Sequence, residues 1–121
     1  MHSLRCTVLA LVCALLVVPF AMAGNPGMHE TGTVAFANPV RVGGTLLPAG
    51  EYMIRHSMEG QEHMMIFQAL NHKVQDVKVK CQLVQLGAKA HDTRTVYELN
   101  ASNERVLHEL VFAGDSVKHV F

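Results

Sequence analysis

Turn-forming residues recur at short intervals along this chain after residue 37, and they constrain its fold more than any other feature. Gly43-Gly44 separates two alternating runs, Pro48-Ala49-Gly50 precedes a third, and Gly114-Asp115 interrupts the last part of the chain. A Gly-Gly pair favours a two-residue hairpin turn because both central positions tolerate a positive φ. Proline fixes φ at the start of a turn, and glycine accepts the left-handed conformation that ends it. The segments between these turns are short, so the spacing predicts strands.

The hydrophobic pattern between the turns has the period of a β-strand. Residues 77–83 (VKVKCQL) alternate between apolar and polar side chains, which predicts one buried and one solvated face. The apolar run from Met64 to Leu70 is compatible with a helix by propensity, but turn signals on both sides favour a strand. We therefore predict an all-β fold, a small antiparallel β-sandwich or barrel of about eight short strands. It forms a single domain over residues 31–121.

The N-terminal segment has the three parts of a secretory signal peptide. Arg5 supplies a positive charge, residues 6–20 form an apolar run, and Ala21-Met22-Ala23 provides a small-residue cleavage site. A membrane-spanning helix needs about 20 apolar residues, and this run is shorter. The sequence predicts a signal-peptide helix at residues 1–23 and a flexible N-terminal loop at residues 24–30. It also predicts export to the periplasm or the extracellular space, with no stable membrane span after cleavage.

Removal of residues 1–23 changes the cysteine content of the chain. Cys6 and Cys13 leave with the signal peptide, so Cys81 is the one cysteine of the predicted mature chain and no disulfide can form within it. Cys81 lies on the apolar side of its strand pattern, where a buried thiol packs and is chemically inert. The whole chain has 10 Lys+Arg and 10 Asp+Glu, and this balance excludes a strongly basic nucleic-acid-binding surface. We expect an unidentified protein or surface partner instead.

A longer motif surrounds the first turns. Residues 36–52 read FANPVRVGGTLLPAGEY, in which P-V-x-V-G-G is followed by L-P-A-G-x-Y. This stretch resembles the opening of small exported bacterial β-strand proteins of unassigned function. In those proteins one strand ends in the first motif, and the second motif begins the next long strand. The resemblance implies export and a β fold. The Pro, Gly and Tyr residues also have a structural role: a turn, a left-handed residue, and an aromatic side chain that enters the core.

Histidine and methionine gather around a turn at residues 56–65 (HSMEGQEHMM). If Glu59-Gly60 is a two-residue turn, His56 pairs with His63 on one face of the hairpin. The same face then carries Tyr52, Ile54, Met58, Met65 and Phe67. Imidazole and thioether ligands together suit copper, above all Cu(I). The sequence therefore predicts a candidate metal site at His56, Met58 and His63. The alternative is that the methionines fill the core and the histidines are half-exposed polar residues.

Other motifs bear on enzymatic activity. The sequence contains no Gly-x-Ser-x-Gly, Gly-x-x-x-x-Gly-Lys, His-Glu-x-x-His or Cys-x-x-Cys motif. We expect no catalytic residues and no enzymatic activity. The leading hypothesis is a secreted or periplasmic β-sandwich protein that acts as a non-catalytic binding or structural module. Two alternatives stay open: a periplasmic copper-binding protein that uses the His/Met hairpin, and a small hydrolase. Asn100-Ala-Ser102 matches a glycosylation acceptor, and we interpret it as a turn.

Overall fold

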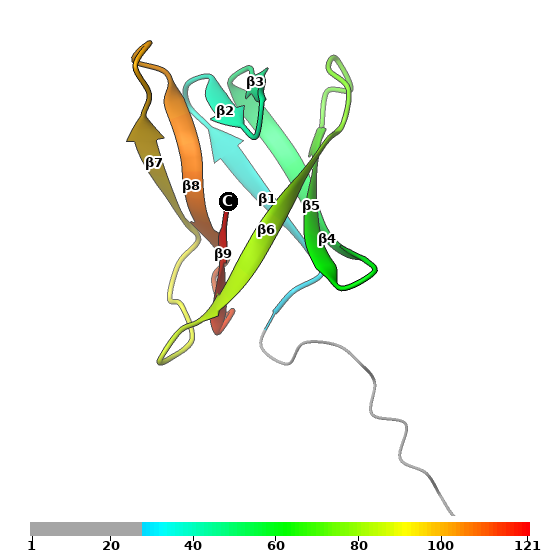
Figure 1. The fold of residues 1–121 in the computed structure, drawn as a ribbon, viewed down its shortest axis with the longest axis vertical. Coiled ribbons are helices and arrows are strands. Elements are labelled where there is room, and N and C mark those ends of the chain that lie inside the picture. Colours follow the sequence, from blue (N-terminus) through cyan, green and yellow to red (C-terminus); the bar gives the residue numbers. More distant parts are fainter. Residues whose placement is uncertain (1–27) are drawn as a thin grey trace, which may run out of the picture.

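The computed structural model describes residues 28–121. The predicted signal peptide at residues 1–23 and residues 24–27 of the predicted N-terminal loop lie outside the described residues. The described part consists of strands and turns (Figure 1). The nine strands are β1 (Thr31–Phe36), β2 (Val40–Val42), β3 (Thr45–Leu47), β4 (Gly50–Glu59), β5 (Glu62–Ala69), β6 (Val77–Gln85), β7 (Arg94–Leu99), β8 (Arg105–Val111) and β9 (Val117–Val120).

Turn residues begin and end the strands much as the sequence predicted. Gly43-Gly44 connects β2 and β3 as a two-residue turn, and Gly43 has the positive φ of 59° that such a turn requires. Gly50 follows Pro48-Ala49 with a φ of 147°, a conformation that other residues rarely adopt. Residues 62–69 form strand β5 and not a helix. The all-β prediction is confirmed, with nine strands in place of about eight.

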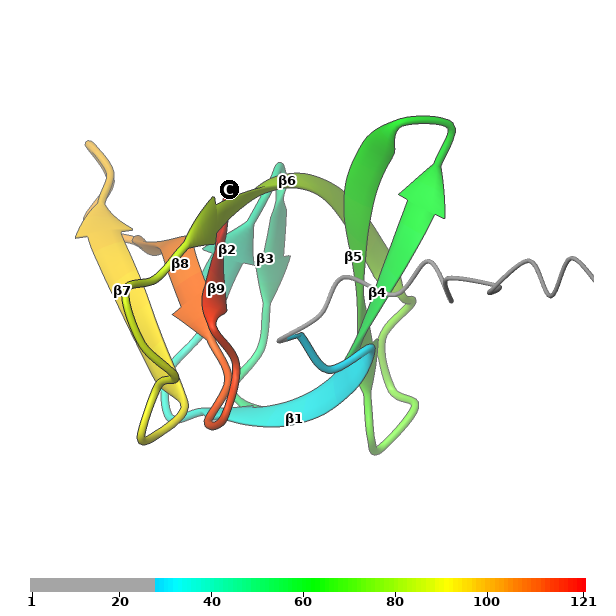
Figure 2. The same cartoon turned by 90° about the horizontal axis from the view of Figure 1, so that it is seen from below.

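Hydrogen bonding links the strands in the order β1-β4-β5-β6-β9-β8-β2-β3, and β7 pairs with β8 outside this path. Every pair is antiparallel except β2 with β8. Figure 2 shows the strands around a common interior, with β1 and β6 on opposite sides. The prediction of a small, mainly antiparallel β-sandwich or barrel is confirmed. In the described part, no helix is long and apolar enough to cross a membrane.

Strand β6 belongs to two sheets because it changes partner midway. One sheet contains β1, β4, β5 and β6, and the other contains β6, β9, β8, β7, β2 and β3. Its first part pairs with β5 and ends at Cys81, which lies opposite His63. Its second part pairs with β9 and begins at Gln82, which lies opposite Val120. Cys81 is buried and both of its neighbours along the strand are exposed, as the alternation predicted. Strand β6 therefore carries the Cys81 thiol into the interior at the junction of the two sheets.

The core fills the space between the two sheets with apolar and aromatic side chains. Its buried members are Val34, Phe36, Val40, Val42, Leu47, Tyr52, Ile54, Met65, Phe67, Ala69, Cys81, Leu107, Leu110 and Phe112. The Tyr52 hydroxyl donates to the Pro48 carbonyl at 2.6 Å, which fixes the turn before β4. Strand β1 approaches the end of β8 at Gly32, where an added Cβ would lie 2.6 Å from the Phe112 ring. Glycine at this position allows the close contact between the sheets.

Candidate metal-binding site at the β4–β5 hairpin

The turn of the β4–β5 hairpin lies one residue later than the sequence predicted. Glu59 pairs with Glu62, so the two turn residues are Gly60 and Gln61. Gly60 has a φ of 62°. The predicted Glu59-Gly60 turn is therefore wrong. The two turn types that suit tight hairpins both require a positive φ at the first central position, and this requirement places glycine first.

The shift moves every cross-strand pair by two residues and leaves the facing of the side chains unchanged. His56 lies opposite Met65 and Met58 lies opposite His63, so the predicted pairing of His56 with His63 is wrong. All four side chains still share one face, because a shift of two residues preserves the alternation. Each strand thus carries a histidine and a methionine two positions apart. Each histidine has a methionine as its cross-strand neighbour.

The two histidines are diagonal neighbours, and their rings are in contact. His56 Nε2 lies 3.0 Å from His63 Nδ1, and the ring centres are 5.0 Å apart. The backbone N–H of His56 donates to the Glu30 carbonyl at 2.7 Å, which holds this part of β4 in place. Met65 is 1% exposed, whereas Met58 is 50% exposed. The four side chains therefore extend from the core to the solvent.

A third histidine and the buried cysteine lie next to this pair. The His119 ring, on β9, is 5.8 Å from the His56 ring between centres, and it is 0% exposed. Its Nδ1 lies 3.9 Å from Cys81 Sγ. Its Nε2 is buried and has no hydrogen-bond partner among residues 28–121. His119 was not among the site residues predicted from the sequence. The available signal was the alternation of Val117 and His119 in the last strand, which places a histidine on an inward face.

Burial disfavours the charged forms of His119, His56 and Cys81. It is the main cause that lowers the pKa of His119 to about 4, and the nearby His56 and His63 lower it further. Burial also lowers the pKa of His56, with His63 as the second cause and Glu30 opposing both. Burial raises the pKa of the Cys81 thiol to about 11. Neutral imidazoles are the form that binds metal ions, whereas a thiol at this pKa stays protonated.

The donor atoms are arranged as two contacting pairs, His56 with His63 and His119 with Cys81. Over residues 28–121, no three His, Cys, Asp or Glu side chains are already placed to hold a metal ion. The predicted site residues His56, Met58 and His63 do lie on one face, with Met65 added by the structure. The chemistry on offer is imidazole and thioether, a ligand pair suited to copper.

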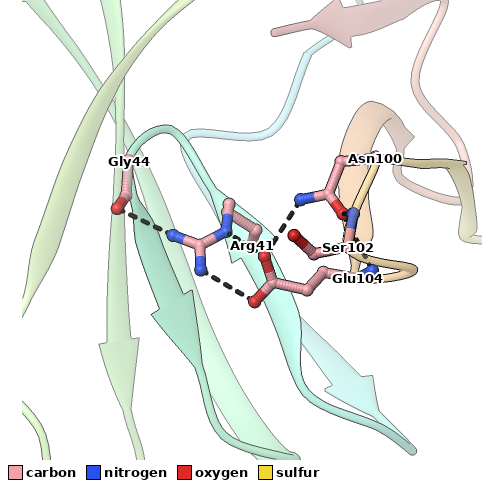
Figure 3. Close-up of polar contacts among 5 residues, drawn as sticks. All are labelled: Arg41, Gly44, Asn100, Ser102 and Glu104. Carbon is pink, nitrogen blue, oxygen red and sulfur yellow. Dashed lines mark hydrogen bonds and ion pairs between the residues drawn. The ribbon is translucent and has the colours of Figure 1, made fainter.

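A second polar cluster joins the β7–β8 turn to β2 (Figure 3). Arg41 donates to both carboxylate oxygens of Glu104 at 3.1 and 2.8 Å, and to the Gly44 carbonyl at 3.0 Å. The Asn100 amide donates to Glu104 at 3.0 Å and accepts from the N–H groups of Ser102 and Glu104. The predicted turn at residues 100–102 is confirmed. Hydrogen bonding from Arg41 lowers the pKa of Glu104. The cluster holds two hairpins together, and its members are occupied with one another.

Comparison with known proteins adds no further assignment. No protein-family model, curated protein or solved structure matches this chain.

Proposed function

We propose that this chain is an exported, non-catalytic protein that binds copper(I) at His56, Met58 and His63, with Met65 as a further thioether. The observation that carries the proposal is the 3.0 Å contact between His56 Nε2 and His63 Nδ1, with a methionine directly opposite each histidine. Thioethers select the soft Cu(I) ion, and imidazole also suits copper. The signal-peptide pattern of residues 1–23 supports export.

The spacing of the two ring nitrogens supports a shared ion. Two metal–nitrogen bonds of about 2.0 Å at a tetrahedral angle place the nitrogens about 3.3 Å apart. His56 Nε2 and His63 Nδ1 are 3.0 Å apart, so a small rotation of either ring makes room for the ion. Without the ion, a proton on one of the two nitrogens bonds to the other nitrogen. A bound Cu(I) ion would take the place of that proton.

The carboxylates nearest the hairpin turn support a non-catalytic role. Glu59 pairs with Lys78, and Glu62 pairs with Lys80, both on the adjacent strand β6. Catalytic carboxyl groups are commonly held in clefts, shielded from solvent. These carboxylates instead lie at the surface, more than half exposed (51% and 56%), in ordinary ion pairs. Their effect is to fasten the hairpin turn to β6.

A competition titration with a chromophoric Cu(I) chelator tests the proposal on protein purified without a histidine tag. The parent should withdraw one equivalent of Cu(I) from the chelator. His56→Ala/His63→Ala should lose this ability, because both imidazole ligands are gone. His91→Ala is the matched control, since His91 is exposed and lies in a turn away from the hairpin. If the double variant competes as well as the parent, the hairpin does not bind copper.

A second candidate function has a site of its own, an apolar pocket between residues 86–91 and strands β7, β8 and β9. Its volume is about 390 Å³, within the range of small-ligand sites. Its lining includes Leu86, Val96, Leu110 and Val111, together with the exposed cations Lys89 and Arg94. An apolar surface beside cationic side chains fits an amphiphile with one acyl chain and an anionic head group.

Isothermal titration with dodecanoate tests this second candidate. Binding should weaken in Lys89→Ala/Arg94→Ala, because the anionic head group loses its cationic partners. Lys73→Ala is the control, since Lys73 is an exposed lysine outside the pocket. Absence of binding by the parent would exclude an amphiphile site at this pocket.

A further inference from the structure

We propose that His119 is a third, buried imidazole ligand of the copper site and that Cys81 holds its ring in position. This proposal rests on the function proposed for the hairpin and extends that site into the interior. The observation that carries it is a fully buried ring beside His56 whose Nε2 has no partner among the described residues.

A buried ring nitrogen without a partner requires an explanation, because burial removes the water that would otherwise bond to it. His119 is 0% exposed, and its Nδ1 lies 3.9 Å from Cys81 Sγ. When Nδ1 carries the ring proton, the N–H group is directed toward the Cys81 sulfur. The lone pair on Nε2 then accepts no hydrogen bond. A metal ion supplies the partner that this lone pair lacks.

The distances from the His56 ring to the His63 and His119 rings are those of imidazoles that share a metal ion. With metal–nitrogen bonds of about 2.0–2.1 Å, two imidazoles on one tetrahedral or trigonal ion have ring centres about 5–6 Å apart. The His56 and His63 centres are 5.0 Å apart, and the His56 and His119 centres are 5.8 Å apart. The three rings of the described chain do not yet surround one point. Binding therefore requires His119 or His56 to rotate about its side-chain bonds.

Cys81 has the position of an outer partner that orients a ligand. A metal-bound histidine commonly donates its other ring N–H to a nearby acceptor, which fixes the tautomer and the ring orientation. Cys81 is 4% exposed and lies opposite His63 on β6, so its sulfur is held by the sheet beside the His119 ring. Cys81 acts through His119 in this arrangement and is a positioning residue.

The proposed third ligand has a structural consequence. His56 lies on β4 and His63 on β5, in one sheet. His119 lies on β9, which pairs with the second part of β6 in the other sheet. An ion held by all three would link the two sheets. Metal binding should therefore raise the thermal midpoint of the protein, because an ion that binds only the folded state stabilises it.

Two measurements test the assignment of His119. The first is the Cu(I) competition titration, in which His119→Gln should bind at least 10-fold more weakly than the parent. His108→Gln is the control, a half-buried histidine on β8 that contacts Glu98. The second is an NMR titration of the parent with Ag(I), a closed-shell probe for Cu(I) sites. Ag(I) should shift the ring signals of His56, His63 and His119 together.

The positioning role of Cys81 has its own readout. Nitrogen chemical shifts of the His119 ring report which nitrogen carries the proton. Cys81→Ala should change this tautomer population and weaken Cu(I) binding about 10-fold, the effect of losing an outer partner. Cys81→Ser should retain the tautomer population and the Cu(I) affinity of the parent, because the serine hydroxyl also accepts a hydrogen bond. An unchanged tautomer in Cys81→Ala would overturn the positioning role.

The outcomes separate this proposal from the function of the hairpin. If Ag(I) shifts His56 and His63 but not His119, or if His119→Gln binds Cu(I) as the parent does, His119 is not a ligand and the hairpin site stands. If Ag(I) shifts none of the three rings, both proposals fail. Should His119→Gln not fold, the NMR titration of the parent decides the question alone.

Discussion

Acidification should destabilise the metal-free protein mainly through His119. Burial and the nearby His56 and His63 lower the pKa of this ring to about 4, compared with 6.5 for an ordinary histidine. Between these values the folded state binds fewer protons than the unfolded state, so stability falls as the pH falls. The groups that face the ring are the two imidazoles, the Cys81 thiol and the Phe112 ring. None of them is an anion that would stabilise the protonated ring.

The size of this effect follows from the difference between the two pKa values. The free energy of unfolding should fall by about 3 kcal/mol in total below pH 4, and by about 2 kcal/mol between pH 7.5 and pH 5. Urea unfolding at the two pH values, followed by circular dichroism in the presence of a chelator, measures the change.

A variant that cannot titrate at this position isolates the contribution of His119. In His119→Gln, the stability loss between pH 7.5 and pH 5 should be smaller than in the parent by about 2 kcal/mol. His91→Gln is the control for the substitution itself, because His91 is exposed. Equal losses in the parent and His119→Gln would refute the reasoning. If His119→Gln does not fold, an NMR pH titration of the parent ring measures its pKa, and a value near 6.5 would refute it equally.

Two further predictions concern the fold. Gly50→Val should lower the thermal midpoint far more than Ala49→Ser, because Gly50 has a φ of 147° and the strain on a branched residue is about 1–3 kcal/mol. Melting at the parent temperature would show that position 50 accepts an ordinary side chain. Leu110→Ala should cost about 2–5 kcal/mol in urea unfolding, since Leu110 is 0% exposed. Leu99→Ala should cost under about 0.5 kcal/mol, since Leu99 is 67% exposed, and similar costs would contradict the assigned core.

The sequence predicts which side chains of a strand face the core, because apolar and polar residues alternate along the strand. The seven residues expected on one face of the β4–β5 hairpin all lie on one face, although the register was wrong by two. The apolar pattern does not determine the register to this precision. A turn at Glu59-Gly60 and a turn at Gly60-Gln61 both contain the glycine, and both keep the apolar side chains on the core face. The conformation required at the first turn position distinguishes them.

The depth of burial was less predictable than the facing. Leu83 lies on the inward side of β6, as the alternation indicated, but it is only half-buried. Burial depends on what covers a residue from the opposite sheet, and this is a matter of strand order. The change of partner of β6 after Cys81, from β5 to β9, is part of that strand order. No local pattern in residues 77–85 predicts this change. The contact between Cys81 and His119 follows from this partner change, so sequence reasoning could not find it.

The interior position of His119 departs from the rules that stabilise a β-sandwich. An apolar side chain at this position would pack against the Phe112 ring without leaving a buried nitrogen unbonded. The histidine instead lies beside two more imidazoles, which makes its protonation costly as well. Sequences break local rules of stability mainly where function requires it. A purely structural module gains nothing from this arrangement, whereas a metal-binding protein gains a neutral ligand that the fold holds next to the His56–His63 pair.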